Sequence, residues 1–157
     1  MTDQGEISRK QFITFRSDEQ EFGADIITIR EIRGWTQATL LSHVPEYVRG
    51  VINLRGTVLP VIDLKARLGR GQTEATAKHA VIVVMAGGRT VGLLVDAVSD
   101  ILTIAKSDIQ PVPELARDVR DNFVEGIAVL DDRMVTLIDM DSLTAFPGAE
   151  NTLTQAA

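Results

Sequence analysis

The sequence predicts a mainly β protein folded as two small barrel-like subdomains with short helices, and three observations support this fold class. The chain has 157 residues, enough to bury about two-thirds of the surface that its unfolded form exposes. Hydrophobic residues make up 45% and aromatic residues only 4%. The apolar residues are therefore mostly Val, Ile and Leu, many of which favour strands. The third observation is that similar hairpin-like patterns recur in the two halves of the chain.

Short apolar segments separated by turn residues predict strands along most of the chain, and three pairs of them are typical of hairpins. Pro60 lies inside one such strand, which we expect to be an edge strand or bulged there, because proline donates no hydrogen bond to a ladder. Asp63 and Asp139 end strands and precede short helices, whose first N–H groups they can cap. The predicted strands are 11–16, 21–25, 48–54, 58–64, 80–85, 90–95, 124–130 and 134–138, and the predicted helices are 64–69, 114–121 and 139–146.

An internal repeat is the strongest sign of how the chain is organised. Segments 50–63 and 126–139 each have 14 residues, begin with glycine and end in Ile-Asp after a turn and an apolar strand. Upstream, segment 22–32 matches segment 91–101, with glycine second and isoleucine last in both. Chance similarity between Val- and Ile-rich hairpins is the alternative. The repeat predicts two subdomains, each of which closes its sheet and so removes exposed strand edges.

The expected organisation is a single domain, 1–157, in two parts. The first repeat half lies mostly within 11–69 and the second mostly within 79–146, with some exchange of strands between them. Residues 1–8 and 147–157 are expected to be flexible tails.

Composition and charge exclude several classes of function. The net charge of −6, from 22 acidic and 16 basic residues, repels nucleic-acid phosphates and anionic lipid. With one Trp and one Tyr, the chain is also a weak candidate for a barrel that stacks single-stranded bases. The absence of cysteine excludes disulfides and is typical of a cytoplasmic protein. The first ten residues lack the apolar core of a secretory signal, and no segment has the roughly 18 apolar residues that span a bilayer.

The sequence contains no recognisable pattern of an active site or metal site. His43 and His79 lie in predicted loops without metal-ligand spacing, so we expect solvated surface histidines. Asp139 and Asp141 lie near the acidic pair at 131–132, but the spacing does not match a calcium loop. An enzyme built on an unrecognised acidic cluster around Asp139 is the alternative in this class. We therefore expect no catalysis, no cofactor and no metal.

Three stretches resemble the CheW family of chemotaxis coupling proteins: 21–35 (EFGADIITIREIRGW), 43–69 (HVPEYVRGVINLRGTVLPVIDLKARLG) and 90–104 (TVGLLVDAVSDILTI). The Asn-Leu-Arg-Gly of 53–56, followed by Leu-Pro-Val-Ile-Asp, is the most distinctive part. The similarity covers about 11–143. The same domain also forms the regulatory end of CheA histidine kinases, but no kinase, dimerisation or phosphotransfer segment accompanies it here.

The resemblance implies two five-stranded SH3-like β-barrels packed side by side and a non-catalytic adaptor in signal transduction. Such an adaptor couples the cytoplasmic tips of methyl-accepting chemoreceptors to the regulatory domain of a CheA-type histidine kinase. It is cytoplasmic and recruited to receptor arrays at the inner membrane without inserting into the bilayer, and it can form rings with kinase domains. A small acidic interaction module in another two-component pathway is the alternative.

The resemblance also places a receptor-binding groove at Ile29, Glu31, Arg55, Val98 and Ile101. An amphipathic receptor helix could lay its apolar stripe in such a groove, while an arginine fork suits carboxylates or backbone carbonyls. Each residue also has a structural alternative. The apolar residues could simply pack in the core, Glu31 could form a surface ion pair, and Arg55 could be an exposed turn residue or bridge the subdomains.

The resemblance assigns kinase contacts to two regions. In the first half they are Val44, Pro45 and Arg49, which precede the Asn-Leu-Arg-Gly hairpin. In the second half they are Gln110 and Leu115, where the family more often has arginine and phenylalanine.

Overall fold

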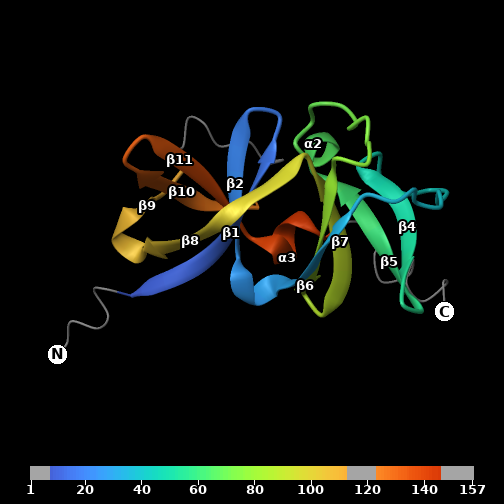
Figure 1. Ribbon diagram of the computed structural model, residues 1–157, viewed down its shortest axis with the longest axis horizontal. Coiled ribbons are helices and arrows are strands. Elements are labelled where there is room, and N and C mark those ends of the chain that lie inside the picture. The colour runs from blue at the N-terminus through green and yellow to red at the C-terminus, as the bar shows by residue number, and fades with distance from the viewer. Residues whose placement is uncertain (1–7, 113–122, 146–157) are drawn as a thin grey trace.

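The computed structural model describes residues 8–112 and 123–145 and shows two β-sheets side by side with short helices (Figure 1). The helix expected over 114–121, the candidate Leu115 and the tail 147–157 lie outside the described residues, as does the tail 1–8 apart from Ser8. No helix within the described ranges is long and apolar enough to cross a membrane.

Each sheet forms one SH3-like barrel. In the first barrel the strand order is β3-β6-β7-β5-β4, and in the second it is β8-β1-β2-β11-β10-β9. The second barrel thus has the expected five strands plus a two-residue addition, β9. The strands are β1 (Arg9–Ser17), β2 (Gln20–Asp25), β3 (Ile29–Gly34), β4 (Val48–Leu54), β5 (Thr57–Asp63), β6 (Ala80–Ala86), β7 (Arg89–Val95), β8 (Ala97–Ala105), β9 (Ile109–Gln110), β10 (Val124–Leu130) and β11 (Arg133–Ile138).

The two sheets do not follow the two sequence halves. The hairpin β1–β2 belongs to the second barrel, where β2 pairs in parallel with β11. The hairpin β6–β7 belongs to the first barrel, where β7 pairs in parallel with β5. Each barrel therefore combines strands from 11–69 with strands from 79–146, because each hairpin joins strands that are far away in the chain.

The internal repeat is visible in the pairing register. Val61 faces Gly92 in the first barrel, and the equivalent Leu137 faces Gly23 in the second. A Cβ on Gly92 would lie 2.8 Å from the Val81 side chain, and one on Gly23 would lie 3.0 Å from Leu137. A residue larger than glycine at either position would therefore force neighbouring side chains to shift.

Capping aspartates start the two equivalent helices, as the sequence predicts. Asp63 accepts hydrogen bonds from the first N–H groups of α2 (Leu64–Arg67), and Asp139 does the same for α3 (Met140–Leu143). β5 lies between β7 and β4, but at Pro60 it is a local edge, one of the two alternatives that the sequence left open. Proline is tolerated there because the ladder to β7 begins only at Val61.

Three apolar clusters form the core. One lies within the first barrel around Leu59 and Val83, and one lies within the second around Phe12 and Leu137. The largest is shared: it combines residues of β1 and β2 with residues of β5, β6 and β7, and both short helices contribute to it. Figure 1 shows α3 between the two sheets, where its buried Met140 and Leu143 join this shared core.

Candidate protein-interaction site

Two equivalent strands, β3 and β8, carry apolar side chains outward at the same repeat positions. Ile29 and Val98 are half-buried and pack against the shared core, so core packing accounts for part of their role. Ile32 and Ile101 are 45% and 54% exposed, so the core does not account for them. Since β3 belongs to the first barrel and β8 to the second, each barrel exposes one of these equivalent isoleucines.

Glu31 of β3 is held by two arginines. Arg55 donates hydrogen bonds to both carboxylate oxygens, and Arg33 donates from Nη1 to Oε2 at 3.1 Å. These interactions lower the pKa of the Glu31 carboxyl, and the hydrogen bond with Arg55 has the largest effect. The predicted residues Glu31 and Arg55 thus form one ion pair, which fixes the position of the Glu31 carboxylate.

The turn between β4 and β5 explains how Arg55 is presented. Arg55 and Gly56 both have positive φ, 50° and 88°. The side chain of Asn53 accepts a hydrogen bond from the Gly56 N–H at 2.8 Å, which closes this turn. The Asn-Leu-Arg-Gly sequence therefore builds a tight turn whose exposed arginine reaches back to β3.

The second barrel contains a related ion pair that the sequence analysis missed. Asp100, the repeat equivalent of Glu31, accepts hydrogen bonds from the Thr14 hydroxyl and from Arg133. These interactions lower the pKa of the Asp100 carboxyl, and the hydrogen bond with Thr14 has the largest effect. Arg133 also binds Glu21. The repeat makes Asp100 equivalent to Glu31, so an arginine partner near the β10–β11 turn could have been predicted from the sequence.

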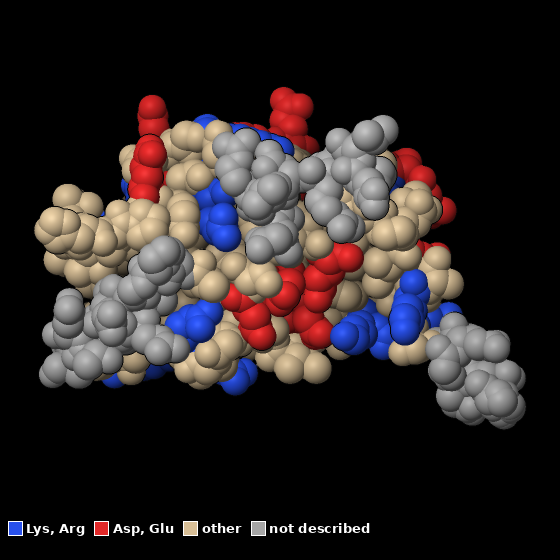
Figure 2. Space-filling model, turned by 180° about the vertical axis from the view of Figure 1, so that it is seen from behind, with Lys and Arg blue, Asp and Glu red and all other residues tan. Residues whose placement is uncertain are grey.

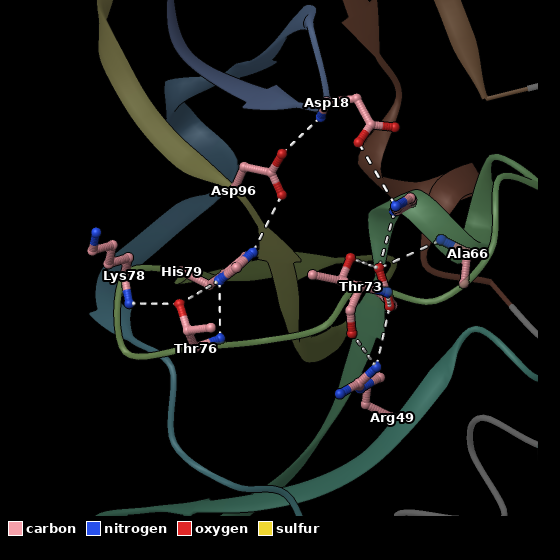
Figure 3. A network of polar contacts seen from close by, with 10 residues as sticks. Asp18, Arg49, Ala66, Thr73, Thr76, Lys78, His79 and Asp96 are labelled. Carbon is pink, nitrogen blue, oxygen red and sulfur yellow. Dashed lines mark hydrogen bonds and ion pairs between the residues drawn. The ribbon is translucent and has the colours of Figure 1, made fainter.

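Arg49, a predicted kinase contact, is engaged within the first barrel. Its Nη1 donates to the backbone oxygen of Thr73 at 2.8 Å and lies 3.5 Å from the Asp63 carboxylate (Figure 3). Its guanidinium lies over the Trp35 ring. Asp63 is fully buried and also accepts bonds from the Thr73 N–H and hydroxyl, each at 2.7 Å. Arg49 thus ties the strap 70–79 to the barrel.

His79 is not the solvated surface histidine that the sequence suggested. Its Nε2 lies 3.5 Å from the Asp96 carboxylate, and its Nδ1 accepts a bond from the Thr76 N–H at 3.0 Å (Figure 3). Asp96 in turn accepts a bond from the Asp18 N–H in the β1–β2 turn. The histidine is partnered because the strap brings it beside the other barrel, whereas His43 is exposed as expected.

The remaining candidates lie in different parts of the molecule. Val44 and Pro45 are half-buried in the segment between β3 and β4, where the nearby Leu40 is 82% exposed. Gln110 is exposed in β9 of the second barrel, paired with Ile127 of β10. Val44 and Pro45 therefore belong to a segment that leads into the first barrel, whereas Gln110 belongs to the second barrel.

Acidic side chains gather across the middle of the face opposite that of Figure 1, flanked by basic ones (Figure 2).

The pKa of the Glu125 carboxyl is raised, first by partial burial and then by the charge of Asp139. Among the described residues no three His, Cys, Asp or Glu side chains are grouped so that they could hold a metal ion.

Comparison with known proteins is consistent with this geometry. Residues 11–146 match the family model of the CheW-like domain. The chain is 50% identical over 141 residues to a chemotaxis protein CheW of Rhizobium meliloti, covering 90% of each chain, and 36% identical over 139 residues to one of Klebsiella aerogenes, covering 88% of this chain and 84% of the relative. Among solved structures, the scaffolding protein TtCheW of Thermoanaerobacter tengcongensis has a TM-score of 0.81 and 35% identity, and the match covers 90% of this chain and 96% of that one.

Proposed function

Because the chain belongs to the CheW-like domain family, whose members are non-catalytic adaptors of chemotaxis signalling, we propose that it couples a methyl-accepting chemoreceptor to a CheA-type histidine kinase. The receptor partner is its cytoplasmic tip, and the kinase partner is its regulatory domain. Coupling places the protein in receptor arrays at the inner membrane, where rings with kinase domains can form.

The single observation that supports this proposal most is that β3 and β8, one strand from each barrel, expose equivalent apolar residues. Ile32 and Ile101 project from equivalent positions above the half-buried Ile29 and Val98, and a carboxylate, Glu31 or Asp100, precedes each exposed isoleucine. An amphipathic receptor helix would cover the apolar residues. The arginine-held carboxylates would orient it.

The kinase contact is proposed for a second surface, the segment between β3 and β4 of the first barrel. Leu40 is exposed there beside the half-buried Val44 and Pro45. Because this segment differs from the outer surface of β3 and β8, one molecule could hold both partners together. Gln110 and Leu115 are proposed for a second kinase contact, made by the other barrel.

An adaptor of this kind works only through unequal binding. It must bind one conformational state of the receptor or kinase more tightly than the other, since equal binding to both would transmit nothing. The Arg49 network gives the first barrel a fixed geometry, so a shift in the receptor could be carried to the kinase instead of being absorbed by the strap.

The test is calorimetric titration of the protein with the regulatory domain of its host's CheA-type kinase. Leu40→Asp should weaken binding at least about tenfold if this segment is the contact. Met134→Asp, a matched change at a residue 63% exposed in the second barrel, should leave the affinity unchanged. Absence of binding by the parent protein would remove the kinase partner and favour a module of another two-component pathway.

A further inference from the structure

Arg67, the last residue of α2, contacts both barrels with one side chain. Its guanidinium carbon lies 4.9 Å from the ring centre of Tyr47 and 4.9 Å from that of Phe123. Its Nε donates a hydrogen bond to the backbone oxygen of Leu143 at 3.1 Å. Tyr47 precedes β4 of the first barrel, whereas Phe123 precedes β10 and Leu143 ends α3, both in the second.

These contacts lie where the two repeat halves meet. Tyr47 and Phe123 are equivalent, since their backbone oxygens accept hydrogen bonds from the N–H groups of Asp63 and Asp139, each at 2.7 Å. In the repeat, Leu143 is the counterpart of Arg67 itself. Arg67 therefore donates a hydrogen bond to Leu143, its counterpart in the other half, and lies over the equivalent rings of Tyr47 and Phe123. At this position of the repeat, the first half has an arginine and the second half has a leucine.

Most of the contact between the barrels is apolar and carries little directional information. The shared core is made of aliphatic and aromatic side chains, and burial of such groups is non-directional. A hydrogen bond and cation–π contacts, in contrast, depend on distance and angle. Arg67 thus supplies directed contacts at a junction that could otherwise rotate with little change in buried area.

Other polar links between the barrels are simpler. Lys65 lies 3.8 Å from the Asp18 carboxylate, and Arg70 donates to the side chain of Gln20 at 2.8 Å. Arg89 donates to the Thr144 hydroxyl at 3.3 Å. Each of these joins one polar group of the first barrel to one of the second, whereas Arg67 is half-buried and meets three groups.

We propose that Arg67 is a positioning residue that fixes the angle between the two barrels. That angle sets the spacing between β3 and β8, which belong to different barrels and carry the proposed receptor surface. Arg67 also contacts Tyr47, the last residue of the segment between β3 and β4 that is proposed for the kinase contact. Only the consequence for receptor binding rests on the proposed function; the effect on the angle does not.

The angle can be measured directly because the chain contains no cysteine. Spin labels at Thr57→Cys and Asp132→Cys, exposed positions near the hairpin ends of the two barrels, report the distance between them by electron–electron resonance. In the doubly labelled protein, Arg67→Ala should broaden or shift the distance distribution. Arg67→Lys, which keeps the charge but not the planar fork, should restore it in part, and Arg70→Ala should leave it unchanged.

A distribution for Arg67→Ala that coincides with that of the parent overturns the proposal, even if the variant is less stable. A purely stabilising role lowers the folded fraction but does not change the geometry of the folded molecules. If the alanine variant does not fold, Arg67→Lys decides in its place: a distribution broader than the parent's supports the proposal, and an identical one refutes it.

Binding measurements separate this inference from the proposed function. Affinity for a chemoreceptor tip fragment should fall at least about fivefold in Arg67→Ala. If the parent binds no receptor fragment but the distances change, the proposed function fails and the positioning role stands. If the parent binds both partners and the distances do not change, the positioning role fails.

Discussion

Arg49 and Glu125 occupy equivalent positions in the two barrels but carry opposite charges. Arg49 lies 3.5 Å from the buried carboxylate of Asp63. Glu125 instead lies near Asp139, the equivalent of Asp63, and the charge of Asp139 contributes to its raised pKa. One barrel thus balances its capping aspartate with a cation, whereas the other places a second carboxylate beside it.

Glu125→Gln should stabilise the protein at neutral pH. The pKa of Glu125 is raised in the folded state, so its ionised form costs stability once the pH exceeds the unfolded value of about 4.3, and the full cost applies above the folded value. Because the side chain is exposed, we expect a gain below about 1 kcal/mol in the free energy of unfolding. Urea denaturation at pH 7 should show this gain and at pH 3 should not. An equal gain at both pH values, or the same gain from the exposed control Asp132→Asn, would contradict it.

Arg49→Met should lower the free energy of unfolding by about 2 kcal/mol, because it removes charge-assisted hydrogen bonds from a buried network. The arginine holds the Thr73 backbone oxygen and lies beside Asp63. Denaturant unfolding measures the loss, and Arg70→Met, the same change at an exposed arginine, is the control. Weakened kinase binding without loss of stability would show instead that Arg49 is a direct contact.

Arg55→Ala should raise the pKa of Glu31, because the hydrogen bond from Arg55 is the largest cause of its lowered value. The contribution of this pair to stability is complete above the unfolded pKa and is lost as the pH falls through the folded pKa. In the variant the contribution of this pair is absent, and Glu31 takes up its proton at a higher pH than in the parent. Carboxyl-carbon NMR titration of Glu31 measures the change, and Arg33→Ala, which removes the second cause, should produce a smaller rise.

The same Arg55→Ala variant should lower receptor-coupled kinase activity while its thermal midpoint stays nearly unchanged. Arg55 is exposed, and exposed ion pairs add little to stability. Unchanged kinase activity, or unfolding of the variant, would refute this expectation.

Ile101→Asp should weaken binding of a receptor tip fragment without unfolding the protein. Ile101 is 54% exposed, so the new carboxylate can stay solvated in the free protein but would be buried under a bound helix. Fluorescence anisotropy with a labelled receptor fragment measures the affinity. Val129→Asp, at a residue 40% exposed, is the matched control and should bind as the parent does; an equal loss in both variants would argue against a local receptor surface.

Gly92→Ala should destabilise the protein by about 1–3 kcal/mol, the usual cost of overpacking. The added Cβ would lie 2.8 Å from Val81, in the middle of the first barrel. Gly34→Ala is the control, since a Cβ there meets nothing within 4 Å. Thermal unfolding compares the two, and similar midpoints would show that the parallel ladder yields easily at Gly92.

The hairpins and caps could be predicted because they depend on neighbours in the chain. The pattern around 55–57 predicted a turn, and the structure shows β4 and β5 joined there. Asp63 and Asp139 were predicted as caps, and both accept hydrogen bonds from the first N–H groups of their helices. In each case the interaction joins residues only a few positions apart.

The sequence by itself determined the repeat, the turns and the equivalence of Glu31 with Asp100, since these follow from local pattern. Only the tertiary structure decided which hairpin enters which barrel, that Arg133 binds Asp100, and that Arg49 and His79 are engaged inside the fold. The physical reason is that strand pairing and side-chain contacts across long separations depend on the packing of the whole chain. Local alternation of apolar and polar residues shows where a strand lies but not which strand it joins.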